Sequence, residues 1–308
     1  MEQNELALKK AIASGDDNLV YLVLMHLEKE GLGGSGMGKE AFYKMVYAFP
    51  EAVNLLKAYY RQRAGYAERR RLHDLCEWRG NHLEAGTLAV RQAFLQERLE
   101  ARLEGLKEAE NLFGRKKELS FQQAATRDQI ELLEIQRDLE QKTGLPVFID
   151  LSVSETIYHL ISIAATQPAG GAVDGGSLMG EAAQLQKRLR VPDKRFWHLK
   201  IKALASSGQW DALRSFCAER KSPVGYKPFA VACMRHGQPA RETEQYIDKV
   251  QQAEDRYDLY IEMGLWEKAA ETATRLKDPR RIAEVHNLAV TVDGGRAEDA
   301  ATSRITPK

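Results

Sequence analysis

The 308-residue sequence has little of what marks several classes of protein. Its three cysteines, Cys76, Cys217 and Cys233, cannot all pair with one another, and we expect reduced, buried thiols. The 45 basic and 44 acidic residues give a net charge of +1, so no general excess of charge attracts nucleic acid or an acidic membrane. The longest apolar run, Leu19–Leu27, is far too short to span a bilayer, and the N-terminus lacks the apolar segment of a signal peptide. We therefore expect a soluble intracellular protein.

Proline is absent between Pro50 and Pro146, and this long stretch has the apolar spacing of helices. No convincing alternation of apolar and polar residues predicts a strand. Ser120 and Ser152 are each followed three residues later by Gln or Glu, the spacing of a capping box at a helix start. The sequence therefore predicts an all-α protein.

Short helix pairs repeat along the chain. Gly208 and Gly264 each lie two residues before a tryptophan, as in a left-handed helix end followed by the next helix. This irregular repeat predicts an α-solenoid of stacked antiparallel helix pairs that forms a single domain over residues 1–290. Glycine-rich residues 31–38 and 166–180 are expected to be flexible loops, and residues 291–308 a disordered tail.

One helical hairpin is expected to be unusually long and central. Its first arm is predicted to run from Glu84 to Phe113, roughly 45 Å at 1.5 Å per residue. The second arm is predicted to start at Ser120 and to end near Gly144.

The segment Gly33–Lys39 matches the spacing of a phosphate-binding loop. Such a loop follows a β-strand, whereas the residues before Gly31 have the pattern of a helix. Glu40 occupies the position where a Ser or Thr would bind magnesium. A nucleotide-binding enzyme is therefore the less favoured alternative, and we expect neither catalysis nor a bound cofactor, since no catalytic constellation is recognisable.

Two further patterns have more ordinary explanations. His73, Cys76 and His82 could suggest a metal site, but no second pair of ligands accompanies them, and a buried cysteine beside surface histidines is the preferred interpretation. The basic patch Arg61–Arg71, interleaved with tyrosines, is the basis of an alternative function as an RNA-binding helical-repeat protein. Arginines three and four apart on a helix also form ordinary solvated faces with intrahelical Glu pairs, and such a face or a charged protein-partner surface is the preferred interpretation. We therefore expect no nucleic-acid partner.

The stretch VPDKRFWHLK, residues 191–200, reads as the start of a packed helix. Pro192 and Asp193 suit a helix N-terminus. Trp197 is followed at helical spacing by Ile201 and Leu204, which predicts a buried stripe rather than a platform for stacking bases.

VPDKRFWHLK, KSPVGYKPFAVACMRHG (residues 221–237) and residues 127–157 resemble the C-terminal domain of the family of the class C vacuolar protein sorting subunit sixteen. The resemblance spans about residues 40–289. It implies a subunit of the HOPS and CORVET tethering complexes, a scaffold that recruits a Sec1/Munc18-family protein for SNARE-mediated fusion of endosomes with the vacuole or lysosome. The implied partners are that protein directly, the other tether subunits, and SNAREs indirectly. The membrane contact is peripheral, at late endosomes and the vacuole or lysosome, and the family's N-terminal β-propeller has no counterpart in this sequence.

The predicted docking surface is one of two apolar stripes on the arm from Glu84 to Phe113. A solenoid helix can use both stripes for its own neighbours, and this alternative stays open. We favour the second stripe for the partner, because its small residues would let another backbone approach closely. The predicted partner-binding residues are Val90, Phe94, Ala101, Gly105, Ala109 and Leu112, with Arg188 and Lys194 as polar rim contacts.

Overall fold

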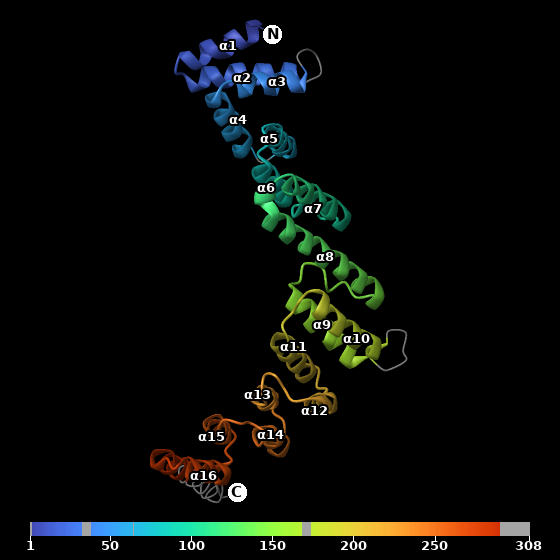
Figure 1. The fold of residues 1–308 in the computed structure, drawn as a ribbon, viewed down its shortest axis with the longest axis vertical. Helices are drawn as coiled ribbons and strands as arrows, with labels where there is room; N and C mark the ends of the chain where they lie inside the picture. Colours follow the sequence, from blue (N-terminus) through green and yellow to red (C-terminus); the bar gives the residue numbers. More distant parts are fainter. Residues whose placement is uncertain (1, 33–37, 64, 168–173, 290–308) are drawn as a thin grey trace, which may run out of the picture. The chain divides into compact units, whose positions relative to one another are not determined.

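The structure is a computed structural model that describes residues 2–32, 38–63, 65–167 and 174–289. This described part contains helices and no strand (Figure 1). The prediction of an all-α protein is therefore confirmed. None of the described helices is both long enough and apolar enough to cross a membrane.

The chain divides into two compact units, residues 1–135 and 136–308. In the first unit, each helix packs mainly on its neighbours along the chain, as in an α-solenoid (Figure 1). The helices are α1 (Glu2–Ala13), α2 (Asp17–Leu32), α3 (Lys39–Tyr47), α4 (Pro50–Gln62), α5 (Tyr66–Trp78), α6 (His82–Ala93), α7 (Leu99–Gly114), the 3₁₀ helix η1 (Lys117–Leu119) and the first part of α8 (Ser120–Thr143). The inward faces of α1 to α7 and of η1 form one continuous core that includes Leu8, Leu24, Phe42, Leu56, Leu75 and Ala109.

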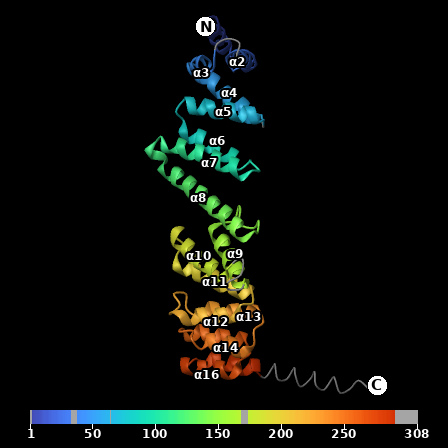
Figure 2. The ribbon, with the colours of Figure 1, turned by 90° about the vertical axis from the view of Figure 1, so that its right-hand side faces the viewer.

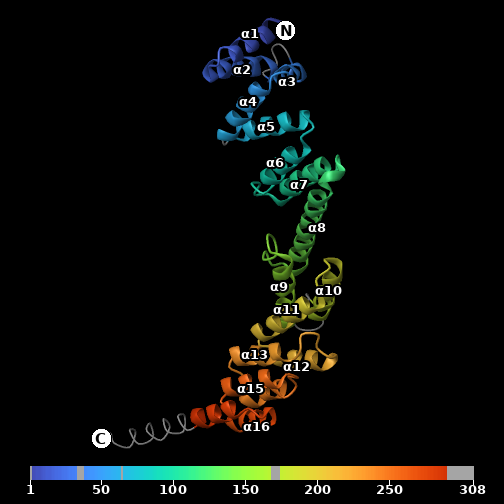
Figure 3. The same cartoon turned by 60° about the vertical axis from the view of Figure 1, so that its left-hand side comes forward.

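In the second unit, too, helices pack mainly on helices close to them along the chain, as α13 and α14 do in Figure 2 and α9, α10 and α11 in Figure 3. After the end of α8 its helices are α9 (Val153–Thr166), α10 (Gly175–Arg188), α11 (Asp193–Ser206), α12 (Trp210–Glu219), α13 (Lys227–Arg235), α14 (Ala240–Ile247), α15 (Ala253–Glu262), α16 (Trp266–Leu276) and a final helical stretch at residues 279–289. The α-solenoid prediction is confirmed, whereas a single domain over residues 1–290 stays a prediction.

Several local signals in the sequence are confirmed. Gly208 and Gly264 have φ of 67° and 68°, and the tryptophans that follow begin α12 and α16. Ser152 accepts a hydrogen bond from the backbone amide of Glu155, whose carboxylate accepts one in return, so the capping box starts α9. Trp197 is buried at the start of α11 as expected, and the three cysteines are buried and free.

Ser120 does not form the predicted capping box. Its backbone is already helical, because the 3₁₀ turn η1 leads directly into α8. The second arm of the predicted hairpin nevertheless has the expected extent, since α8 ends at Thr143.

The first arm of the hairpin is wrong as one helix from Glu84 to Phe113. The chain instead turns at residues 94–98 and folds back, so that α6 and α7 form an antiparallel pair. Arg98 has an extended backbone, and the Arg102 guanidinium donates to the carbonyl of Gln96 across the turn at 3.2 Å. The two shorter helices bury their small residues against each other, which one straight helix could not do.

The predicted flexible loop at residues 166–180 is wrong at its C-terminal end, and its residues 168–173 lie outside the described residues. Asp174 caps α10 by accepting hydrogen bonds from the amides of Gly176 and Ser177, so residues 175–180 are helical. Most of the predicted loop at residues 31–38 and all of the predicted tail at residues 291–308 lie outside the described residues.

Candidate partner-binding site

The α6–α7 pair is held at close range by two glycines. A Cβ atom built at Gly105 would lie 2.9 Å from the Cβ of Ala93, and one at Gly86 would lie 2.5 Å from Cε1 of Phe113. Both distances are too short for real carbon contacts, so only glycine fits at these positions. Gly105, which was predicted to let a partner backbone approach, therefore already receives a helix of the same chain.

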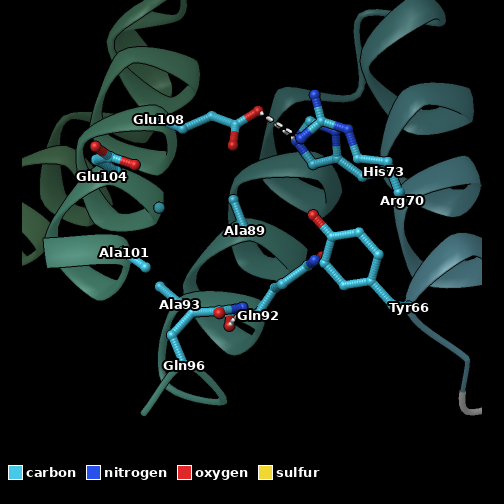
Figure 4. A pocket seen from close by; sticks show the side chains of 11 residues that line it. Tyr66, Arg70, His73, Ala89, Gln92, Ala93, Gln96, Ala101, Glu104 and Glu108 are labelled. Atoms are coloured by element: carbon cyan, nitrogen blue, oxygen red, sulfur yellow. Dashed lines mark hydrogen bonds and ion pairs between the residues drawn. The ribbon is translucent and has the colours of Figure 1, made fainter. Parts of the chain in front are cut away.

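A pocket of about 250 Å³ opens where α5 faces this pair (Figure 4). Figure 4 shows that α5 contributes aromatic and basic side chains, while α6 and α7 contribute small side chains, amides and carboxylates. Its lining consists of Tyr66, Arg70, His73, Ala89, Gln92, Ala93, Gln96, Ala101, Glu104, Gly105 and Glu108.

Charged groups of both signs surround this pocket. Nη1 of Arg70 lies 3.4 Å from Oε1 of Glu108, and Nε of Arg70 lies 3.6 Å from the carboxylate of Asp74. Glu104 on α7 is exposed at the pocket. The arrangement can therefore accept hydrogen-bonding and charged side chains from a partner, and it combines them with the small apolar surface of Ala89 and Ala101.

His73 is the buried polar group of the pocket, with 3% of its surface exposed. Its Nε2 lies 3.8 Å from Oε1 of Glu108 and its Nδ1 lies 3.6 Å from Oδ1 of Asp74, and neither nitrogen makes a hydrogen bond among the described residues. The expectation of surface histidines in this segment is therefore wrong for His73, because α5 turns it toward α7.

Among the described residues, His73, Cys76 and His82 do not come together as possible metal ligands. The group with suitable geometry is His73, Asp74 and Glu77, whose potential ligand atoms lie within 4.8 Å of one another. Its carboxylates already face cations, since Asp74 pairs with Lys39 and Glu77 lies 2.9 Å from Nη1 of Arg115. Burial, with the charge of Glu84 adding to it, raises the pKa of Cys76 to about 12, so that thiol is a poor metal ligand at neutral pH.

The sequence-predicted partner residues of the first unit fall into two groups. Phe94 is 45% exposed at the α6–α7 turn, and Val90 and Ala101 are half-buried. Ala109 is fully buried, and Leu112 is buried beside it in the core of the unit.

Arg188 and Lys194 belong to the second unit, at the end of α10 and the start of α11. Both side chains are exposed. Their part in the same partner contact stays a prediction.

The basic patch Arg61–Arg71 lies on α4 and α5 and is extensively paired. Arg61 binds Glu84, which also accepts from Lys57 at 2.6 Å, and Arg71 lies 2.8 Å from the buried carboxylate of Glu28. These pairs neutralise charge that an RNA backbone would need. The patch therefore supports packing of α2, α4, α5 and α6.

The segment Gly33–Lys39 lies mostly outside the described residues. The residues before it form α2, a helix, and Lys39 begins α3 and pairs with Asp74. The strand that a phosphate loop requires is thus replaced by a helix.

Sequence reasoning missed most of the pocket. Tyr66, Gln92 and Glu108 come from three different helices, and their proximity depends on the turn at residues 94–98. The signal that could have found it is the pairing of Gly86 with Phe113 and Gly105 with Ala93, at spacings that suit an antiparallel pair.

Known proteins resemble this chain over nearly its whole length. A Vacuolar protein sorting-associated protein 16 homolog of Dictyostelium discoideum is 29% identical over 282 residues, 90% of this chain and 31% of that protein. Protein VACUOLELESS1 of Arabidopsis thaliana is 28% identical over 291 residues, 92% of this chain and 31% of that protein. The chain thus spans about a third of the length of these relatives. The family model "Vps16, C-terminal region" matches residues 1–305, and the chain belongs to that family.

Proposed function

We propose that this chain is a scaffold domain of a membrane-tethering complex in vacuolar protein sorting, and that it recruits a Sec1/Munc18-family protein. Membership of the "Vps16, C-terminal region" family supports the role in vacuolar sorting. The stacked helices support the scaffold role, because a solenoid offers an extended surface rather than an enclosed active site. In this proposal the other tether subunits also bind this chain, whereas SNAREs interact with it only indirectly, through the recruited Sec1/Munc18-family protein. The complex contacts the membrane peripherally, at late endosomes and the vacuole or lysosome.

The exposed apolar turn between α6 and α7 is the observation that supports assigning the partner interface to particular residues. Phe94 and Leu95 are 45% and 63% exposed there, beside the pocket that Ala101 and Glu104 line. Interfaces combine such aromatic anchors with nearby polar groups. The exposed Phe94, Leu95 and Glu104, together with the half-buried Val90 and Ala101, are named the α6–α7 surface.

Ala109 and Leu112 lie in the core of the unit rather than on this surface. Replacing the fully buried Ala109 with Asp would place an unpaired charge in the core, which costs several kcal/mol. We therefore expect Ala109→Asp to lose partner binding together with helix content around α6 and α7. Gly105 contributes in the same indirect way, through its contact with Ala93.

The proposal is tested by calorimetry with a purified Sec1/Munc18-family protein and the Phe94→Glu variant. Because Phe94 is 45% exposed on a turn outside the core, circular dichroism should show an intact fold, while the affinity should fall at least about tenfold, equivalent to about 1.4 kcal/mol. Leu22→Glu is the matched control, an exposed apolar residue on α2 of the same unit. Unchanged affinity in Phe94→Glu would remove the α6–α7 surface from the interface, and an equal loss in Leu22→Glu would show that the effect is not specific to it.

A further inference from the structure

A second open groove lies in the other unit, between α11 and α13. Its volume is about 460 Å³. Two rows of side chains line it at helical spacing, His198, Ile201, Lys202 and Ala205 from α11 and Pro228, Val231, Ala232 and Arg235 from α13. Each row covers two turns, about 10 Å at 1.5 Å per residue.

The floor of the groove is apolar and made partly of small residues. Ile201 and Ala205 are buried, and Val231 and Ala232 are half-buried. Alanines on both walls leave room for another helix to approach closely, and anchor residues spaced by three and four would meet the floor once per turn. The shape therefore fits an amphipathic helix better than a flat surface.

The charged lining of the groove has one sign. It comprises Lys202, Lys227 and Arg235, with His198 and His236 beside them, and no Asp or Glu. Nζ of Lys227 lies 2.6 Å from a carboxylate oxygen of Asp255, so this charge is partly matched. Arg235 is exposed and has no ion-pair partner among the described residues, and Nζ of Lys202 lies 5.2 Å from the centre of the Tyr158 ring rather than beside a carboxylate.

We propose that this groove is a docking site for an acidic amphipathic helix of a partner protein. The apolar face of that helix packs on the floor between Ile201 and Val231, and its carboxylates pair with Lys202 and Arg235 at the rim. An apolar floor beneath a rim of one charge selects its partner by both properties, because a basic helix would meet like charges and a fully polar segment would leave the floor uncovered. This site is separate from the α6–α7 surface and does not depend on the proposed recruitment function.

The test uses the whole chain and a fluorescent 15-residue peptide, with Leu at positions that repeat every three and four residues and Glu elsewhere. Fluorescence anisotropy should show saturable binding with a Kd on the order of 10–100 µM, as suits a single helix on a small groove. A peptide with Lys in place of each Glu should bind at least about tenfold more weakly. Absence of saturable binding, or equal binding of the two peptides, would overturn the proposal.

Variants of the protein locate the site. Lys202→Glu combined with Arg235→Glu should weaken peptide binding at least about tenfold, whereas Arg241→Glu, an exposed arginine on α14 outside the groove, should leave it unchanged. If the double variant with reversed charges unfolds, Lys202→Gln combined with Arg235→Gln removes the same two positive charges without introducing negative ones. Equal losses in the groove variant and in Arg241→Glu would refute the site.

Lipid vesicles distinguish a membrane from a protein partner. Vesicles of phosphatidylcholine with phosphatidylserine carry negative charge but no helical anchors. We expect the acidic peptide to bind this chain equally well when such vesicles are added, because the vesicles should not displace the peptide from the groove. Vesicle binding that depends on Lys202 and Arg235, with no peptide binding, would contradict the proposal and assign the groove to anionic lipid.

Discussion

The close contact between Gly86 and the ring of Phe113 should make the α6–α7 pair intolerant of any side chain at residue 86. A Cβ there would lie 2.5 Å from Cε1, 2.7 Å from Cζ and 2.8 Å from Cδ1 of Phe113, which is buried and has little room to move. Overpacking of this kind costs about 1–3 kcal/mol, and the valine side chain adds two methyl groups beyond Cβ. The gain in helix propensity over glycine offsets only about 0.5 kcal/mol. We therefore expect Gly86→Val to lower the free energy of unfolding by about 2 kcal/mol.

A second substitution tests whether the ring is the cause. Leu in place of Phe113 lacks the two ring atoms nearest to the built Cβ, Cε1 and Cζ. Phe113→Leu alone should cost about 1 kcal/mol, and the double variant should be more stable than the sum of the single effects by about 1 kcal/mol. Urea denaturation followed by circular dichroism gives the free energies, and hydrogen exchange shows whether the loss lies in α6 and α7.

Gly180 provides the matched control. It lies inside helix α10, and a Cβ there would have no neighbour within 4 Å. Gly180→Val should therefore be neutral or slightly stabilising. The reasoning is refuted if Gly86→Val behaves like Gly180→Val, or if the Gly86 and Phe113 effects simply add.

Two further predictions concern charge and capping. Burial by itself raises the pKa of Glu84, but hydrogen bonds from Lys57 and Arg61 outweigh the effect of burial and hold that pKa below its ordinary value of 4.5. The ionised Glu84 carboxylate therefore stabilises the fold fully at pH values above 4.5, and this stabilisation is lost as the pH falls through the lower pKa of the folded state. Glu84→Gln should cost about 1.5–3 kcal/mol at pH 7, and in urea titrations the difference from the unmodified chain should shrink below about pH 4, whereas a pH-independent difference would contradict the ion-pair explanation. Ser152→Ala should remove the capping box of α9 and lower the free energy of unfolding by about 1 kcal/mol, as measured by thermal melts. Ser120→Ala, which removes no cap, should change it by less than about 0.5 kcal/mol in the same experiment. Equal losses in the two variants would contradict the difference between the two helix starts.

The helices were predictable where local chemistry decides them. Gly208 and Gly264 require a positive φ that glycine adopts without strain, and Ser152 with Glu155 satisfies the free amides at the start of α9. Trp197 was predicted to be buried because its apolar neighbours recur at helical spacing. These features depend on a few adjacent residues, so the sequence alone was enough.

The turn between α6 and α7 was not predictable from the same signals. Residues 94–98 contain neither glycine nor proline, and their apolar spacing continues that of a helix. The turn is favoured by contacts that exist only after folding, Gly105 against Ala93 and Gly86 against Phe113. Tertiary packing thus overrides the local pattern.

The partner-binding residues stay a prediction, and the structure separates them by burial. Phe94 is exposed and Ala101 is half-buried, whereas Ala109, which was also predicted to contact the partner, is fully buried. Two apolar stripes on one straight helix cannot be divided into core and surface by periodicity. The position of α6 decides which residues are covered.

Recruitment of a Sec1/Munc18-family protein can be measured by mixing that purified protein with this chain. Size-exclusion chromatography with light scattering would give the mass of the complex. We expect the two proteins to elute together at a mass above either alone, and Phe94→Glu to reduce the complex while Leu22→Glu does not. Separate elution of two folded proteins at concentrations of tens of micromolar, on the order of a weak specific Kd, would refute the proposed recruitment.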